Sequence, residues 1–319
     1  MNILLPKTIT TAMFATGTNI PAVDSSVGEV AWATGGTFAV GDRRTDGNYW
    51  YECVKAVSGS PANTYAPSSV LCASYWAKDE EAPTNRWAPF DEYLFSKARR
   101  VGDVTYVLTP GFVDGVAVHG IEADKLTISA TMGAGGANLI EPQVVDLWQQ
   151  AYGLYEYLFG DLQHGTKYTL KGIPLHPDVH ITIKAERNTP TEQAAIGYIS
   201  VGRWQQLFAP GSLSTNASTS GASAEIRSYS YFRQNEQTGL YTRKRGRQSI
   251  DLSIPCVVNG NEGERVRNLL ATVLDVPVAM EASDLAQYSW LSTVGFITGR
   301  IGSPSKGLVE IYFKVKGNP

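Results

Sequence analysis

Short segments rich in β-branched residues recur along the chain and are separated by turn residues. Residues 104–108, 115–121 and 125–131 are rich in Val, Ile and Thr and are bounded by Gly, Pro or Asp, as strands are. The segments 180–185 and 195–203 have the same character. This pattern predicts a mainly β protein built from sandwich-length strands.

One segment has helical spacing instead. Its apolar residues recur at i, i+3, i+4, i+7 and i+8, the spacing of one buried helix face. They are Val266, Leu269, Leu270, Val273 and Leu274. Asn259 and Asn261 are candidate N-caps, and Pro277 follows the end. We therefore expect one C-terminal amphipathic helix over about 261–275, covering a β-sandwich.

Composition shifts suggest four regions. Residues 1–47 are expected to form an N-terminal arm with short strands, and 48–210 a β-sandwich region. A Ser/Thr-rich loop follows at 211–223, and 224–319 form a C-terminal β element with the helix. Within the second region, the aromatic segment 147–159 is expected to be a core strand or an interface element.

The segment from Trp76 to Asp91 concentrates two Trp, one Phe, one Arg and several carboxylates around Pro and Asn. Pro and Asn favour turns, so we expect a loop without a regular strand. Loops normally expose small polar residues, and aromatics this dense therefore require an explanation. An alternating strand pattern, Asn48–Lys55, lies upstream.

The strand Asn-Tyr-Trp-Tyr-Glu-Cys at 48–53 and the loop Pro-Thr-Asn-Arg-Trp at 83–87, followed by Phe-Asp at 90–91, resemble a motif of tail and baseplate proteins of tailed bacteriophages. The likeness covers residues 45–95 well and 180–203 and 224–316 loosely. The chain departs from the motif at Ala82, where Gly is more usual, and at Pro89, where Met or Leu is.

The resemblance implies one or two jelly-roll or galactose-binding-like (carbohydrate-binding-module-like) β-sandwiches. It also implies a non-enzymatic structural protein of the virion tail, at the tail tip or baseplate, assembled in the host cytoplasm. Its expected partners are tail tube, hub or fibre proteins and further copies of itself in a ring. The alternative function is a carbohydrate-binding module that recognises host surface glycans.

The candidate residues of the aromatic loop are Trp76, Asn85, Arg86, Trp87 and Asp91. In one interpretation the aromatics close the edge of a sandwich core, Arg86 pairs with Asp91, and Asn85 caps a turn. In a second they pack against another subunit, because aromatics and Arg are enriched in interface cores. In a third an indole stacks on a sugar ring while Asn, Asp and Arg bind hydroxyls.

A basic cluster is the one concentrated charge of the chain. It comprises Arg243, Lys244, Arg245 and Arg247. The resemblance to phage tail proteins implies that this cluster is an assembly interface with neighbouring subunits. A solvated face is the alternative, and contact with nucleic acid is a further option. The formal net charge of −3 argues against direct nucleic-acid binding, which needs a basic footprint. No apolar run approaches the roughly 20 residues of a membrane span, and the first residues do not have the pattern of a signal peptide.

No catalytic constellation is legible, so we expect no enzyme, no cofactor and no metal. His176 and His180 stand at i, i+4, but Pro177 favours an extended segment in which they lie too far apart to share one ion. The acidic run 79–81 and Asp91 do not by themselves provide the paired acids of a glycosidase. The three cysteines, Cys53, Cys72 and Cys256, are expected to be buried reduced thiols.

Overall fold

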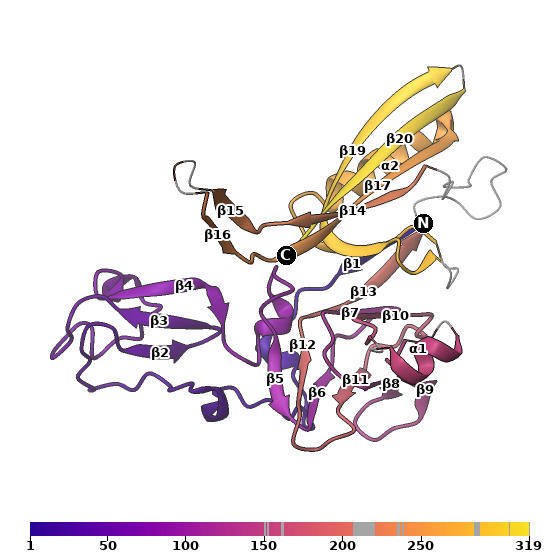
Figure 1. The fold of residues 1–319 in the computed structure, drawn as a ribbon. Coiled ribbons are helices and arrows are strands. Elements are labelled where there is room, and N and C mark those ends of the chain that lie inside the picture. The colour runs from indigo at the N-terminus through magenta and orange to yellow at the C-terminus, as the bar shows by residue number, and fades with distance from the viewer. Residues whose placement is uncertain are drawn as a thin grey trace.

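The structure is a computed structural model that describes residues 1–149, 151, 153–160, 163–206, 221–234, 237, 239–283, 288–305 and 307–318. The fold is mainly β, as predicted, and its paired strands are antiparallel (Figure 1). Within the described residues, none of the helices has both the length and the apolar character required to cross a bilayer.

The largest sheet has nine strands, which come from both the N-terminal and the C-terminal parts of the chain. Its order is β10 (Lys167–Lys171), β7 (Gly115–His119), β13 (Tyr198–Gln206), β1 (Asn2–Pro6), β18 (Val278–Glu281), β19 (Ser292–Ser305), β20 (Leu308–Gly317), β17 (Gln248–Asn259) and β14 (Ser223–Ser228). Strand β1 lies between β13 and β18 and pairs with both. The segment expected to be an arm thus contributes a strand that joins the two halves of the sheet.

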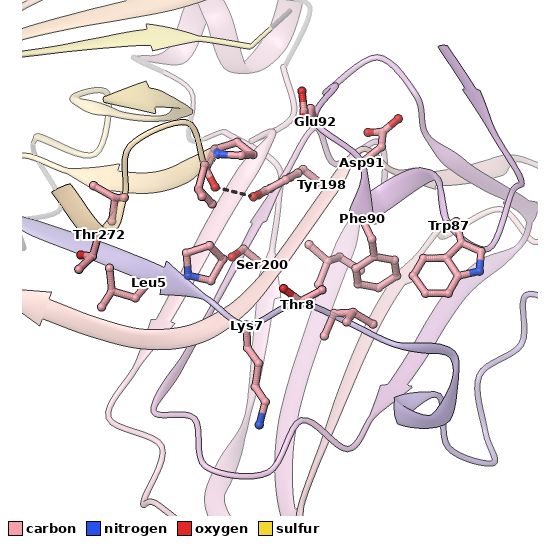
Figure 2. Close-up of a pocket in the computed structure, with 16 residues that line it drawn as sticks. Leu5, Lys7, Thr8, Trp87, Phe90, Asp91, Glu92, Tyr198, Ser200 and Thr272 are labelled. Carbon is pink, nitrogen blue, oxygen red and sulfur yellow. Dashed lines mark hydrogen bonds between the residues drawn. The ribbon is translucent and has the colours of Figure 1, made fainter. Parts of the chain in front are cut away.

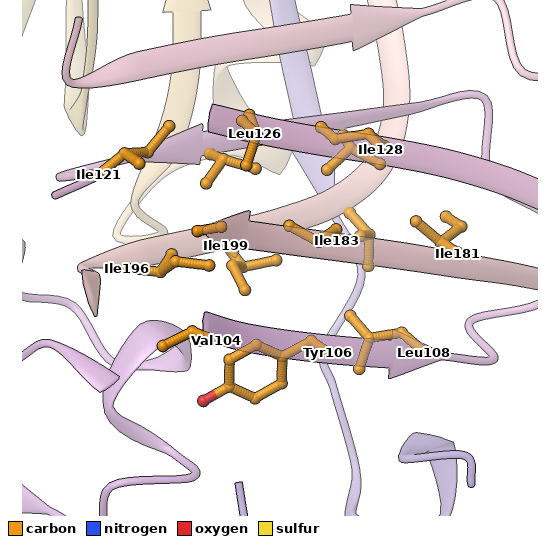
Figure 3. Close-up of a cluster of buried hydrophobic side chains, with 14 of the residues drawn as sticks. Val104, Tyr106, Leu108, Ile121, Leu126, Ile128, Ile181, Ile183, Ile196 and Ile199 are labelled. Carbon is orange, nitrogen blue, oxygen red and sulfur yellow. The ribbon is translucent and has the colours of Figure 1, made fainter. Parts of the chain in front are cut away.

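A second sheet packs against one end of the first. Its order is β6 (Asp103–Leu108), β11 (Val179–Glu186), β8 (Lys125–Met132) and β9 (Asn138–Asp146). Alternate residues of β6, β8 and β11 are buried, and these side chains form one apolar cluster with those of β7 and β13 (Figure 3). The pair β5 (Ala98–Val101) and β12 (Gln193–Ile196) contributes to the same core. The strands predicted over 104–108, 115–121, 125–131 and 180–185 are confirmed, whereas the segment 195–203 is divided between β12 and β13, which belong to different sheets.

A separate three-stranded sheet corrects the prediction for the aromatic segment. It consists of β2 (Arg43–Asp46), β3 (Tyr49–Cys53) and β4 (Trp76–Pro83). The first half of the expected loop is therefore a strand that pairs with β3, and a register shift between Tyr49 and Tyr51 brings Pro83 opposite Tyr49. Pro is tolerated here because β4 is an edge strand.

The C-terminal half holds the longer of the two described α-helices. Helix α2 (Gly263–Thr272) follows a 3₁₀ turn, η5 (Gly260–Glu262), so its N-cap is Glu262 rather than either expected Asn. Val266, Leu269 and Val273 are buried against the sheet. Leu274 is exposed because the helix ends before it. The prediction that Leu274 lies on the buried face of the helix is therefore wrong.

Two further elements expose most of their side chains. Helix α1 (Leu154–Phe159) lies where a core strand was one of the two expectations for residues 147–159. The prediction of a single helix is therefore also wrong. Strands β15 (Tyr231–Gln234) and β16 (Tyr241–Lys244) form a two-stranded hairpin. Most of the predicted Ser/Thr-rich loop, residues 211–220, lies outside the described residues. Cys53, Cys72 and Cys256 are buried free thiols, as predicted.

Candidate functional site

The structure divides the five candidate residues of the aromatic segment. Trp76 is 3% exposed and belongs to the small core of the three-stranded sheet, where its ring meets the edge of Phe38 at 5.1 Å between centroids. The other four follow β4 in a turn that includes the 3₁₀ helix η4 (Ala88–Phe90). We refer to Thr84–Asp91 as the aromatic turn.

Asn85 joins three parts of the chain that are far apart in sequence. Its Nδ2 donates to Asp24 Oδ2 at 2.7 Å and to the Arg99 carbonyl at 2.9 Å, and its Oδ1 accepts from Arg99 N at 2.8 Å. The residue is 7% exposed, so leaving these groups unpaired would carry a desolvation penalty. Asn85 is therefore a tertiary cross-link and not a local turn cap.

Two buried carboxylates complete this cross-link. Glu29 accepts from Asn85 N and from Asp24 N, both at 2.6 Å. Burial raises the pKa of Glu29, although these two backbone hydrogen bonds act to lower it. Burial also acts to raise the pKa of Asp24, but hydrogen bonds from Ser26 and Asn85 bring this pKa below its ordinary value. The sequence analysis missed both acids, although Asp24-Ser-Ser is a recognisable cap signal.

Arg86 and Trp87 pack against an aromatic cluster instead of facing solvent together. Arg86 Nε donates to the Ile20 carbonyl at 2.9 Å, and its guanidinium lies 5.1 Å from the centroid of Phe14. Trp87 meets Phe14 and Phe90 edge-on, with centroids 5.2 and 6.0 Å apart. These contacts fit the first interpretation of the segment, in which its aromatic residues close the edge of a core, because Phe90 also packs on the buried ring of Tyr106.

Asp91 does not pair with Arg86. Its carboxylate accepts from Tyr93 N at 2.8 Å and from the Ser96 hydroxyl. Burial raises the pKa of Asp91 to about 6, against the hydrogen bonds from Ser96 and Tyr93 that lower it. Asp91 therefore carries a carboxyl group that titrates closer to neutrality than an ordinary aspartate.

Trp87 and Asp91 line a cavity of about 440 Å³ (Figure 2). Its other walls come from the end of β1, from β13 and from the last residue of α2 with the segment that follows it, residues 272–277. The cavity therefore lies on the seam between the two halves of the long sheet. Polar groups of Thr8, Glu92 and Ser200 join Asp91 there. An apolar cleft with a few polar groups has the form of a small-ligand site.

The basic cluster lies on and beside the hairpin. All eight residues of β15 and β16 are exposed, and Arg243 pairs in register with Phe232. Arg245 is also exposed. Arg247 differs from the rest of the cluster, because its guanidinium lies 3.1 Å from the centroid of Phe95 and 4.0 Å from Glu81. It secures the base of the hairpin, whereas Arg243, Lys244 and Arg245 are presented to solvent.

The histidine pair has local partners. His176 Nδ1 accepts from Asp178 N at 3.1 Å, and His180 Nε2 lies 3.5 Å from the carboxylate of Asp178. In the part of the chain that the structure describes, no group of three or more His, Cys, Asp or Glu residues has the arrangement of a metal site.

Comparison of the chain with protein-family models, with curated proteins and with solved structures finds no match. Function is therefore inferred from the geometry of the chain itself.

Proposed function

We propose that this protein is a non-enzymatic structural subunit of a bacteriophage tail, at the tail tip or baseplate. In this proposal the two packed sheets around residues 98–206 form a galactose-binding-like sandwich. The subunit assembles in the host cytoplasm and becomes part of the virion, where it contacts tail tube, hub or fibre proteins and further copies of itself.

The observation that carries the proposal is the exposed hairpin. Tyr231, Phe232 and Tyr241 are 52%, 61% and 66% exposed, and they stand beside the cations of Arg243 and Lys244. Large apolar side chains gathered on a projecting element mark interaction surfaces, and aromatics with Arg are the residues enriched there. A catalytic role would not require such an element.

The aromatic turn supports the proposal in a different way. The motif whose residues resemble phage tail proteins makes internal contacts, since Asn85 and Trp87 connect the three-stranded sheet with the segment 14–29 and with Arg99 on β5. A motif with this role links separate sheets through buried contacts, as a subunit of a rigid assembly requires.

Mass spectrometry of purified phage particles tests the proposal. We expect peptides of this chain in intact particles and in purified tails. In particles complemented with a gene carrying Arg243→Glu and Lys244→Glu, electron microscopy should show incomplete tails. The matched control, Lys314→Glu with Lys316→Glu, reverses two exposed lysine charges on β20 and should leave tails intact. Absence of the chain from purified particles would contradict the proposal.

A second candidate function is saccharide binding, which the cavity at Trp87 and Asp91 favours. An indole at the rim and hydroxyl-binding groups in the cleft are the elements of sugar recognition. Calorimetric titration of surface glycans should then show binding that Trp87→Ala and Asp91→Asn abolish. Trp76 is buried in another core, so Trp76→Phe should retain that binding.

A further inference from the structure

Helix α1 exposes almost only apolar side chains. Leu154, Tyr155, Tyr157, Leu158 and Phe159 are between 56% and 78% exposed. A surface helix of a globular protein normally buries one apolar stripe and exposes a polar face. Five apolar side chains on six residues instead form a surface patch of the kind that contacts another protein.

The segment that contains α1 is acidic, and Lys125 on β8 is the cross-strand neighbour of one of its carboxylates, Asp146. From residue 126 to 166 the sequence has no Lys or Arg and four carboxylates, which are Glu141, Asp146, Glu156 and Asp161. Glu141 and Asp146 are exposed on β9, the edge strand of its sheet. Backbone contacts of Trp148 with His164 and of Gln149 with Gln163 hold both ends of the intervening segment beside β9. We call α1 with β9 the acidic face.

The hairpin has the opposite charge. From residue 226 to 250 the sequence has six Lys or Arg residues and one carboxylate, Glu236. Its aromatic side chains are exposed beside these cations, and the rings of Phe232 and Tyr241 lie 5.3 Å apart. The hairpin and the acidic face are therefore complementary in charge and alike in exposed aromatic surface, the combination that guides specific association.

The two surfaces cannot meet within one chain. Figure 1 places the hairpin and α1 on opposite sides of the molecule, with the long sheet between them. An interface between two different patches of identical subunits is heterologous, and its repetition gives a ring where the rotation closes. Each copy then presents one hairpin and one acidic face.

We infer that the acidic face binds the β15–β16 hairpin of a second copy of this chain, head to tail. The inference deepens the proposed function and rests on it, because it names the contact through which the structural subunits associate. Aromatic side chains of the hairpin pack on α1, while Arg243 and Lys244 face the carboxylates of β9.

Charge reversal on both surfaces tests this contact with purified full-length protein. The hairpin variant carries Arg243→Glu and Lys244→Glu, and the acidic-face variant carries Glu141→Lys and Asp146→Lys. All four side chains are exposed, so both variants should keep the circular dichroism spectrum and Tm of the parent. We expect each variant alone to associate roughly 100-fold more weakly, because two attractions become repulsions.

Mixing the two variants is the decisive measurement. In an alternating assembly the reversed hairpin meets the reversed face, and the unchanged hairpin meets the unchanged face. Native mass spectrometry should therefore show oligomers with equal numbers of both variants, whereas Lys314→Glu with Lys316→Glu should assemble like the parent.

Three results would overturn the head-to-tail contact. They are a parent that stays monomeric at all concentrations, single variants that assemble like the parent, and a mixture that remains monomeric although the parent assembles. The presence of the chain in purified virions is measured independently, so failure of this contact and failure of the proposed function are separable.

Discussion

The aromatic turn and the hairpin have similar compositions and opposite environments. Both combine aromatic rings with arginine. In the turn, Asn85 is 7% exposed and the rings pack on Phe14 and Tyr106, whereas in the hairpin every strand residue is exposed. Aromatic and arginine density therefore does not distinguish a core element from a surface element.

The difference follows from where polar groups find partners. The Arg86 guanidinium donates to the Ile20 carbonyl, and the Tyr106 hydroxyl donates to the Arg86 carbonyl at 3.0 Å. Polar groups that find long-range hydrogen-bond partners can be buried at a lower free-energy cost than unpaired ones. Among the residues that the structure describes, the two strands of the hairpin pair only with each other, and a two-stranded ribbon alone has no layer that covers its faces.

The largest expected effect comes from Asn85→Ala. The substitution removes the donor to Asp24 and leaves both backbone groups of Arg99 without their side-chain partner. Loss of partners for buried polar and charged groups should lower the free energy of unfolding by about 3 kcal/mol. Denaturant titration measures it. The control is Asn138→Ala at an exposed position of β9, expected within about 0.5 kcal/mol. Equal effects of both variants would contradict the cross-link.

Trp87→Ala is expected to have the next largest effect. The indole is half-buried and meets two rings edge-on, so its removal should lower the free energy of unfolding by about 2 kcal/mol. Phe232→Ala is the matched change on the hairpin, and we expect it to alter stability by less than about 0.5 kcal/mol. A comparable loss in both variants would show that the two segments share one kind of environment.

Asp91 should make stability depend on pH in a smaller but specific way. Its pKa is about 6 in the fold and about 4 in an unfolded chain. Between these values the native state binds more protons, so the contribution of Asp91 to stability falls as pH rises from about 4 to 6. Because the side chain is partly exposed, we expect on the order of 1 kcal/mol.

Thermal unfolding of Asp91→Asn across this pH range checks the effect. Subtracting the variant from the parent isolates Asp91 from Asp24, whose lowered pKa acts in the opposite direction. A parent-minus-variant difference that does not change between pH 4 and 6 would refute the assignment.

The local parts of the fold were accessible from the sequence, and the long-range parts were not. The sequence predicts strands over 104–108 and 180–185 because β-branched residues and flanking turn signals are local properties. The place of β1 between β13 and β18 depends on pairing with residues about 200 and 280 positions away, which no local pattern contains.

The candidate site shows the same limit. The sequence identifies Trp87 as unusual for a loop and Asn85 as a candidate turn cap, but their partners Asp24, Arg99 and Phe14 are set by tertiary packing. Trp76 was grouped with them because it is near in sequence, although it lies on a strand in a separate core. Helix α1 was missed because its apolar residues cover all sides and have no helical periodicity.

The smallest expected effect on the monomer is also the sharpest test of the comparison. Phe232→Ala combined with Arg243→Ala removes one exposed ring and one exposed cation that face each other across the hairpin. Since neither side chain is buried, the free energy of unfolding of the monomer should change by less than about 0.5 kcal/mol. Sedimentation of the same variant should nevertheless show loss of self-association, and added salt should weaken the parent in the same direction. If this variant unfolds easily, the hairpin belongs to the core as the aromatic turn does. If this variant associates normally, the exposed aromatics of the hairpin have no role in an interface.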